Sequence, residues 1–155
     1  MSSPEQRLAS LGITLPTPAA PVANYVGTVR TGNLLVISGQ LCFGADGKLA
    51  ATGKLGAGVS VDDAKAAARL SAINILAQVK AQVGSLDKVV RVVRLGGFIA
   101  CTPDFTQHPA VMNGASDLIV EVLGDRGRHA RTTIGVPSLP LDSAVEVEAL
   151  IEVDA

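Results

Sequence analysis

Two charged segments near the carboxyl end of the chain carry the side chains best suited to chemistry. The first, residues 126–131, reads Arg-Gly-Arg-His-Ala-Arg and is the most concentrated positive charge in the sequence. Because a planar guanidinium can form two parallel hydrogen bonds with a carboxylate, this segment could bind an anionic small molecule. The plainer alternative is a solvated loop between a helix and a strand.

The second segment, residues 142–155, contains five acidic residues and no basic one. Acidic and apolar residues alternate in it, so in a strand Glu146, Glu148 and Glu152 would share one face. A strand with one solvent-exposed face and one buried face explains this pattern. If instead Glu146 entered a cleft near Arg131, its carboxyl group could act in proton transfer.

The expected pairing of these segments would permit such a cleft. A turn near Pro140 would join them as an antiparallel hairpin, with Gly135 opposite Glu146. Arg131 and Thr133 share the face of Gly135 in that register. The hairpin therefore predicts that Arg131 and Glu146 lie on the same face of the sheet.

Motifs that would imply a cofactor or a metal fail on their spacing. Residues 53–58 precede an expected helix, but they lack the Walker spacing, and Val61 stands where GxGxxG needs its third glycine. His108 and His129 form neither an HxxxH nor an HExxH pair, and no GxSxG elbow occurs. We expect no cofactor and no metal.

Composition narrows the class of protein. Hydrophobic residues make up 48% of the 155 residues and charged residues 17%, which excludes a disordered chain. A net charge of −1 and an aromatic content of 3% argue against a nucleic-acid or anionic-membrane binder. Cys42 and Cys101 form no CxxC and are most simply small buried hydrophobes. The start of the chain has no signal-peptide pattern, and prolines interrupt its charge-free run, so we expect a cytoplasmic protein without a membrane segment.

Five strands and two helices must position the charged segments. Alternation, turn residues and helical spacing predict the order β-β-α-β-α-β-β, with strands over 25–30, 34–38, 89–101, 131–136 and 145–153 and helices over 60–84 and 110–123. This is an α+β domain in which two helices cover one face of a mixed sheet. Residues 34–37 are apolar on both faces, so the uncovered face should meet a second copy of the chain.

The first twenty residues differ from the rest. A short helix over residues 4–11 ends at Gly12, and the prolines at 16, 18 and 21 then favour an extended connector. We therefore divide the chain into an N-terminal extension, residues 1–20, and a single domain, residues 21–155.

Three blocks of sequence stand in an order and register that carry a family resemblance. They are Tyr25-Val26 with Gly32-Asn33 and Ser38-Gly39-Gln40; Ala130-Arg131 with Leu139-Pro140; and Val-Glu-Val-Glu-Ala at residues 145–149. Together they resemble the Rid family (reactive intermediate deaminases, also called YjgF-like proteins or L-PSP endoribonucleases). The resemblance spans residues 21–153.

The resemblance implies a chorismate-mutase-like (YjgF-like) fold, assembled as a homotrimer with its sites between subunits. It implies hydrolysis of short enamine or imine acids of the 2-aminoacrylate type to 2-keto acids and ammonia, without a cofactor. The expected partners are thus a small-molecule carboxylate substrate and further copies of the chain.

The resemblance also assigns site residues, position by position, to this sequence. Arg131 corresponds to the arginine that holds the substrate carboxylate, and Glu146 to the glutamate near the attacking water. Pocket-lining positions correspond to Tyr25, Ser38 and Gly39. The family's asparagine on the second helix corresponds to Asn113 with one residue of slippage, and Thr133 replaces the cysteine of many members.

Two other functions remain open. One is an endoribonuclease with His108 or His129 as the acid–base group, although the net charge and the scarcity of aromatic residues weigh against it. The other is a trimer that binds a small molecule without turnover.

Overall fold

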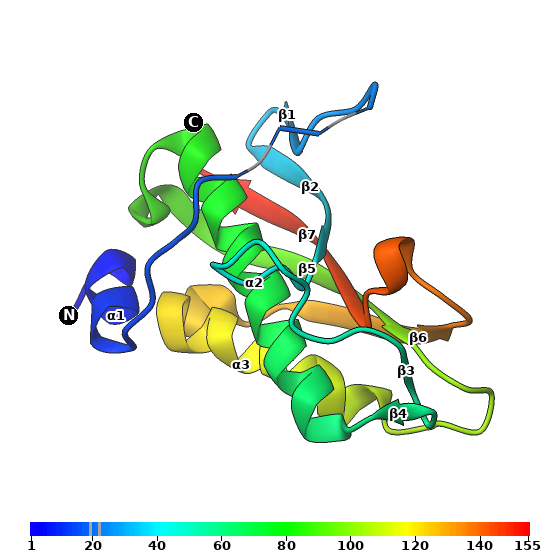
Figure 1. The fold of residues 1–155 in the computed structure, drawn as a ribbon. Helices are drawn as coiled ribbons and strands as arrows, with labels where there is room; N and C mark the ends of the chain where they lie inside the picture. The colour runs from blue at the N-terminus through cyan, green and yellow to red at the C-terminus, as the bar shows by residue number, and fades with distance from the viewer. Residues whose placement is uncertain (19, 22) are drawn as a thin grey trace.

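A five-stranded mixed sheet forms one layer of the molecule (Figure 1). A computed structural model describes residues 1–18, 20–21 and 23–155. The strand order is β1-β2-β7-β5-β6, and only β5 and β6 are parallel. The bounds are β1 (Thr28–Thr31), β2 (Leu34–Leu41), β5 (Val89–Ala100), β6 (Ala130–Val136) and β7 (Val145–Val153).

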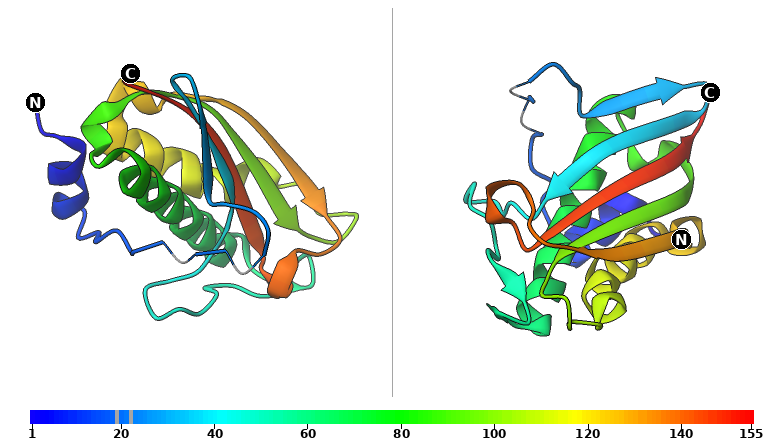
Figure 2. Two further views of the ribbon diagram at one scale, coloured as in Figure 1. Left: turned by 90° about the horizontal axis from the view of Figure 1, so that it is seen from above. Right: turned by 90° about the vertical axis from the view of Figure 1, so that its right-hand side faces the viewer.

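Two long helices, α2 (Val61–Val83) and α3 (His108–Leu123), form the second layer on one face of the sheet (Figure 2). The Ser60 hydroxyl accepts a hydrogen bond from the Asp63 amide at the start of α2, and Gly84 ends the helix with a φ of 87°. Both boundary residues match the prediction. The α+β fold with two helices on one sheet face is confirmed.

The core lies between these two layers. Large side chains buried in it come from both the strands and the helices, and they include Leu35, Leu95, Ile151, Leu76 and Leu118. In β7 the odd-numbered residues are buried and the even-numbered residues are partly exposed. The alternation predicted for this strand is therefore observed.

The predicted hairpin between β6 and β7 is wrong, because β5 lies between these strands. Helix α3 carries the chain from the end of β5 back to the start of β6, and such a crossover gives parallel strands. Strand β7 then pairs antiparallel with the free side of β5. Glu146 lies opposite Phe98 of β5 and Leu41 of β2, not opposite Gly135.

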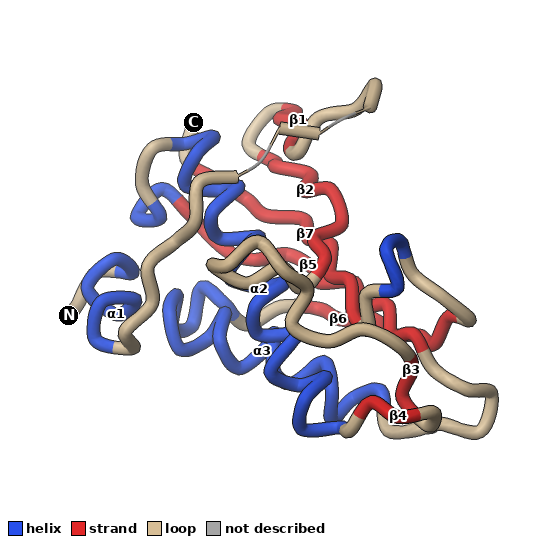
Figure 3. Tube along the Cα trace, in the orientation of Figure 1, coloured by secondary structure: helices blue, strands red, loops and turns tan. Residues whose placement is uncertain are grey.

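The loop expected over residues 53–58 is interrupted by short strands, because β3 (Lys54–Leu55) and β4 (Gly58–Val59) form there. They form a separate two-stranded sheet beside the start of α2 (Figure 3). A bridge between Leu55 and Cys101 ties this small sheet to the end of β5.

The N-terminal helix α1 (Pro4–Ser10) packs against the domain. Leu8 is 4% exposed and belongs to the hydrophobic core. The Glu5 carboxylate accepts a hydrogen bond of 2.9 Å from the backbone amide of Leu86. The predicted proline-rich connector includes residue 19, which lies outside the described residues.

The sheet face opposite the helices carries exposed apolar side chains. Val29, Val36 and Ile134 are 53%, 47% and 47% exposed, whereas Leu35 and Ile37 beside them are buried against the helices. The prediction that residues 34–37 are apolar on both faces is confirmed. Across the described ranges, every helix is too short or too polar to cross a membrane.

Candidate functional site

The predicted site residues fall into two groups, which are carried by different helices and strands. Asn113, Arg131 and Thr133, together with Ser116 and His129, form what we call the arginine cluster, on α3 and the edge strand β6. Tyr25, Ser38, Gly39 and Glu146 lie on or beside β2 and β7 and form the glutamate cluster.

A chain of hydrogen bonds fixes Arg131 in the arginine cluster. Its Nη1 donates to Asn113 Oδ1 at 2.8 Å and to Ser116 Oγ at 3.1 Å. Ser116 Oγ lies 2.9 Å from His129 Nε2, and His129 Nδ1 lies 2.6 Å from the Gly127 carbonyl oxygen. Because a carbonyl oxygen only accepts, Nδ1 carries a proton, and the Ser116 hydroxyl is hydrogen-bonded to Nε2 at the other side of the ring.

This arrangement leaves part of the guanidinium free. Within the described residues, the side-chain hydrogen bonds of Arg131 all come from Nη1, and no carboxylate forms a salt bridge with it. Its Nη2 and Nε groups can therefore donate two parallel hydrogen bonds to a ligand carboxylate.

The other arginines of the basic segment have different surroundings. Arg126 donates to the Val89 carbonyl at 2.8 Å and so ties η2 (Gly124–Gly127) to β5. Arg128 is 73% exposed and lies 3.3 Å from Asp125. Arg131 alone of the three reaches α3, so the solvated-loop interpretation fits Arg128 and fails for Arg131.

Thr133 lies two residues beyond Arg131 on the same face of β6. Its Oγ1 donates to the Gly97 carbonyl at 3.4 Å. A Cβ at Gly97 would lie 2.5 Å from Met112 Sδ and 2.8 Å from Thr133 Oγ1. The missing side chain at Gly97 therefore lets β5 pack closely against α3.

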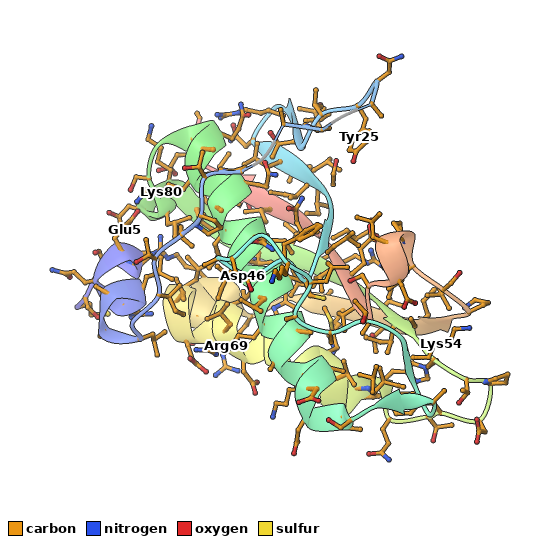
Figure 4. All side chains as sticks on the ribbon, viewed as in Figure 1. Glu5, Tyr25, Asp46, Lys54, Arg69 and Lys80 are labelled. Carbon is orange, nitrogen blue, oxygen red and sulfur yellow. The ribbon has the colours of Figure 1, made fainter. Side chains whose placement is uncertain are left out.

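A β-bulge shapes the glutamate cluster. The register between β2 and β7 shifts between Ile37 and Gln40, so Ser38 and Gly39 lie outside the regular ladder. Ser38 Oγ donates to the Val26 carbonyl at 2.6 Å, which holds the segment before β1 against β2. Tyr25 projects from this segment and is 60% exposed (Figure 4).

Glu146 occupies the space left by the missing side chain of Gly39. A Cβ at Gly39 would overlap Glu146 Oε1 and would lie 2.9 Å from its Cδ. Burial raises the pKa of the Glu146 carboxyl above its ordinary value, and the nearby Glu148 carboxylate raises this pKa further. Arg94 lies 3.7 Å from Glu148 and balances part of that charge.

The expectation that Arg131 and Glu146 share a face is wrong for a single chain. Arg131 pairs with Leu95, which is fully buried on the helix side. Glu146 pairs with Phe98, three residues further along β5 and hence on the opposite face. One subunit alone does not bring the two side chains together.

Sequence reasoning missed Ser116 as a site residue and left His129 as an open alternative. Asn113 and Ser116 are three residues apart on α3, which places them on one face of the helix. His129 directly precedes β6 and is two residues from Arg131. The helical spacing is the signal that the sequence offered.

The cysteine prediction holds for Cys42 alone. Cys42 is fully buried, but Cys101 is partly exposed and its sulfur lies 3.4 Å from His108 Nε2. In the part of the chain that the structure describes, no three His, Cys, Asp or Glu side chains gather as a metal site would require.

Known proteins of similar sequence share this fold over nearly the whole chain. A protein of unknown function from Agrobacterium tumefaciens is 50% identical, with a TM-score of 0.91 over 97% of this chain and 92% of that one. A Shewanella oneidensis protein described as a putative endoribonuclease is 37% identical, with a TM-score of 0.94 over 98% and 100%. Protein TCP17 of Trypanosoma cruzi is 48% identical over 148 residues, which are 95% of this chain and 92% of TCP17.

RidA from an Antarctic Psychrobacter species is a more distant structural relative. It is 28% identical, with a TM-score of 0.61 over 88% of this chain and 94% of RidA. The family described as "YjgF/chorismate mutase-like, putative endoribonuclease" matches residues 5–153. The chain belongs to this YjgF/chorismate mutase-like family.

Proposed function

We propose that the protein hydrolyses short 2-imino acids of the 2-aminoacrylate type to 2-keto acids and ammonia. The observation that carries this proposal is that the Arg131 guanidinium is hydrogen-bonded through Nη1 alone within the described residues. Nη1 is held by Asn113 and Ser116, and Nη2 and Nε are free to bind a substrate carboxylate. Fixing the carboxylate in this way orients the neighbouring C=N bond.

Glu146 supplies proton transfer in this proposal. Its raised pKa favours the protonated carboxyl, which can donate a proton to the imine nitrogen. Water oxygen then bonds to the imine carbon and gives a proton back to the Glu146 carboxylate. The resulting amino alcohol loses ammonia and leaves the keto acid, so the reaction consumes one water and needs no oxidant.

The two clusters would meet between subunits of a homotrimer. Arg131 and Glu146 lie on opposite sheet faces within one chain, so a shared site requires a second copy. The exposed apolar residues Val29, Val36 and Ile134 provide a surface for that copy. We therefore infer that the glutamate cluster of one subunit faces the arginine cluster of its neighbour.

The comparisons support the proposal at the level of family. RidA is a structural relative at 28% identity, and the family description itself names endoribonucleases. The endoribonuclease alternative places His108 or His129 at the reacting atoms. Both ring nitrogens of His129 already have partners, and His108 Nε2 faces a thiol. Imine hydrolysis fits these surroundings better.

Ammonia release from freshly generated 2-iminopropionate tests the activity. We expect release above the spontaneous rate, and no cleavage of a mixed-sequence RNA under the same conditions. Binding without turnover would instead indicate a sensor. RNA cleavage without ammonia release would support the nuclease and reject the deaminase.

Subunit complementation tests the shared site. Arg131→Ala and Glu146→Gln should each lose most of the activity. Trimers reassembled from an equal mixture should regain about one quarter of the parental sites, because each half of a site is intact with a probability of one half. No recovery in verified mixed trimers would overturn the shared site. A monomer by light scattering would also overturn the proposal.

A further inference from the structure

A second site lies where β5 and β6 end and α3 begins. A cavity of about 470 Å³ opens there, lined by residues from β3, the end of β5, the following loop, α3 and β6. These include Lys54, Cys101, Phe105, His108 and Gly135. Lys54 stands at this end of the molecule, at the opposite end from Tyr25 of the glutamate cluster (Figure 4).

The cavity contains a thiol and an imidazole in direct contact. Cys101 Sγ lies 3.4 Å from His108 Nε2. The ring of Phe105 meets the His108 ring edge-on, with centroids 5.2 Å apart and planes at 72°. Backbone hydrogen bonds fix Cys101, because its amide donates to the Val136 carbonyl at 3.0 Å.

Gly135 makes room for this pair. A Cβ at position 135 would lie 2.6 Å from both Cys101 Sγ and His108 Nε2. Three elements thus bring the pair together: the end of β5, the first residue of α3 and a glycine of β6. Cys42 has none of these features, because it is fully buried and hydrogen-bonded to Ser143 and to the Ala51 carbonyl.

We propose that Cys101 is a nucleophilic thiol that reacts with small carbon electrophiles carrying an acidic group. His108 Nε2 takes the thiol proton, and the thiolate sulfur bonds to the electrophilic carbon while the leaving group departs with its bonding electrons. Lys54 faces the same cavity and has no salt bridge within the described residues, so its ammonium attracts an anionic reagent.

Alkylation of the native protein tests this proposal. Iodoacetate, which loses iodide on attack, is applied at pH 7, and labelled peptides are quantified by mass spectrometry. We expect Cys101 to react about tenfold faster than N-acetylcysteine, since a free thiol is only a few per cent thiolate at this pH. Cys42 should stay unlabelled until the protein is denatured.

Three variants separate the roles. His108→Gln keeps a polar side chain but lacks the base, and should return Cys101 to the rate of N-acetylcysteine. Lys54→Met should lower the iodoacetate rate relative to the rate with neutral iodoacetamide, whereas Lys48→Met, in an exposed turn, should leave that ratio unchanged. Gly135→Ala should separate the thiol from the imidazole and slow labelling if His108→Gln does not fold.

The proposal does not depend on imine hydrolysis. It is overturned if Cys101 in the folded parent reacts no faster than N-acetylcysteine, or if neither His108→Gln nor Gly135→Ala slows the reaction. Equal ratios of iodoacetate to iodoacetamide labelling in Lys54→Met and in the parent would overturn the preference for anionic reagents.

Discussion

The Glu146 carboxylate lies directly over the Cα of Gly39, in space that any other residue would fill with its Cβ. The register between β2 and β7 shifts between Ile37 and Gln40, so this glycine lies outside the regular ladder. A carboxyl group on the outer sheet face is thereby kept partly out of water, and its pKa is raised.

Gly39→Ala should therefore turn the Glu146 carboxylate toward solvent. We expect its pKa, measured by NMR on glutamate-labelled protein, to fall toward the ordinary value. The rate of deamination should drop about tenfold or more, in line with the usual contribution of a placed acid–base group. Gly44→Ala is the control, because a Cβ there meets only Asp46 and Lys48 atoms at 3.2 Å or more. An unchanged pKa in Gly39→Ala would contradict the proposed cradle.

Arg131→Ala should remove the anchor of the substrate carboxylate. Loss of a charged hydrogen-bonded pair in a confined site corresponds to roughly 2–5 kcal/mol, which is about a thirtyfold to several-thousandfold loss of kcat/KM. Arg131→Lys keeps the charge without the fork and should retain binding better than turnover. Arg128→Ala, at an exposed residue of the same segment, should have little effect. Equal kinetics in Arg131→Ala, Arg128→Ala and the parent would reject the carboxylate anchor.

Ser116 should act as a positioning residue, because its hydroxyl connects Arg131 to His129. Ser116→Ala removes an acceptor from a charged donor, a loss of about 1.5–3 kcal/mol, or roughly tenfold to 150-fold in kcat/KM. Most of the loss should be in KM, since the carboxylate is bound in both ground and transition states. Ser116→Thr keeps the hydroxyl and should restore KM. A loss of fold stability without a KM change would instead show a purely structural role.

The local features of the fold were readable from the sequence. Alternation in β7, the cap at Ser60 and the stop at Gly84 each depend on neighbouring residues. Strand order does not depend on neighbouring residues in this way. Consecutive strands most often pair as a hairpin, which is the arrangement we expected for β6 and β7. The local pattern does not report strand order, because β7 lies between β2 and β5 and still alternates.

The site residues likewise divide into those that the sequence indicated and those that only the structure brings together. Positional resemblance picked Asn113 and Arg131, and the structure brings these two into contact at 2.8 Å. The Ser116–His129 contact joins a helix to a distant strand, so no local pattern announces it. The expected proximity of Arg131 and Glu146 depended on the strand order, and it failed together with that order.

Close packing of α2 on α3 should make Gly114 sensitive to substitution. A Cβ there would overlap the backbone carbonyl of Lys65, which cannot move without shifting α2. Overpacking costs about 1–3 kcal/mol, and overlap with a backbone atom places Gly114→Ala in the upper part of this range. That cost exceeds the roughly 1 kcal/mol by which alanine is the better helix former. We expect Gly114→Ala to lower Tm by several degrees, at roughly 2–4 °C per kcal/mol. Ala66→Leu, on the exposed face of α2, should leave Tm nearly unchanged.

Glu146→Gln should make the protein more stable than its parent at neutral pH while abolishing deamination. The folded state raises the pKa of Glu146 through burial and the Glu148 charge, so it disfavours the ionised carboxyl. Parental stability is therefore complete below the ordinary glutamate pKa, near about pH 4, and falls as the pH rises through the higher folded value. Glutamine does not ionise and escapes this loss.

The difference in Tm between Glu146→Gln and the parent should thus be close to zero at about pH 4 and become positive by pH 7. Thermal unfolding across this range measures it. Glu152→Gln is the matched control on the same strand face, because its carboxylate lies 3.4 Å from Arg91 and that attraction is lost in the variant. The Tm of Glu152→Gln relative to the parent should not increase as the pH is raised. A Tm difference for Glu146→Gln that turns negative with rising pH would mean that the ionised carboxylate has a stabilising partner in the assembled protein, and the proposed acid at this position would have to be abandoned.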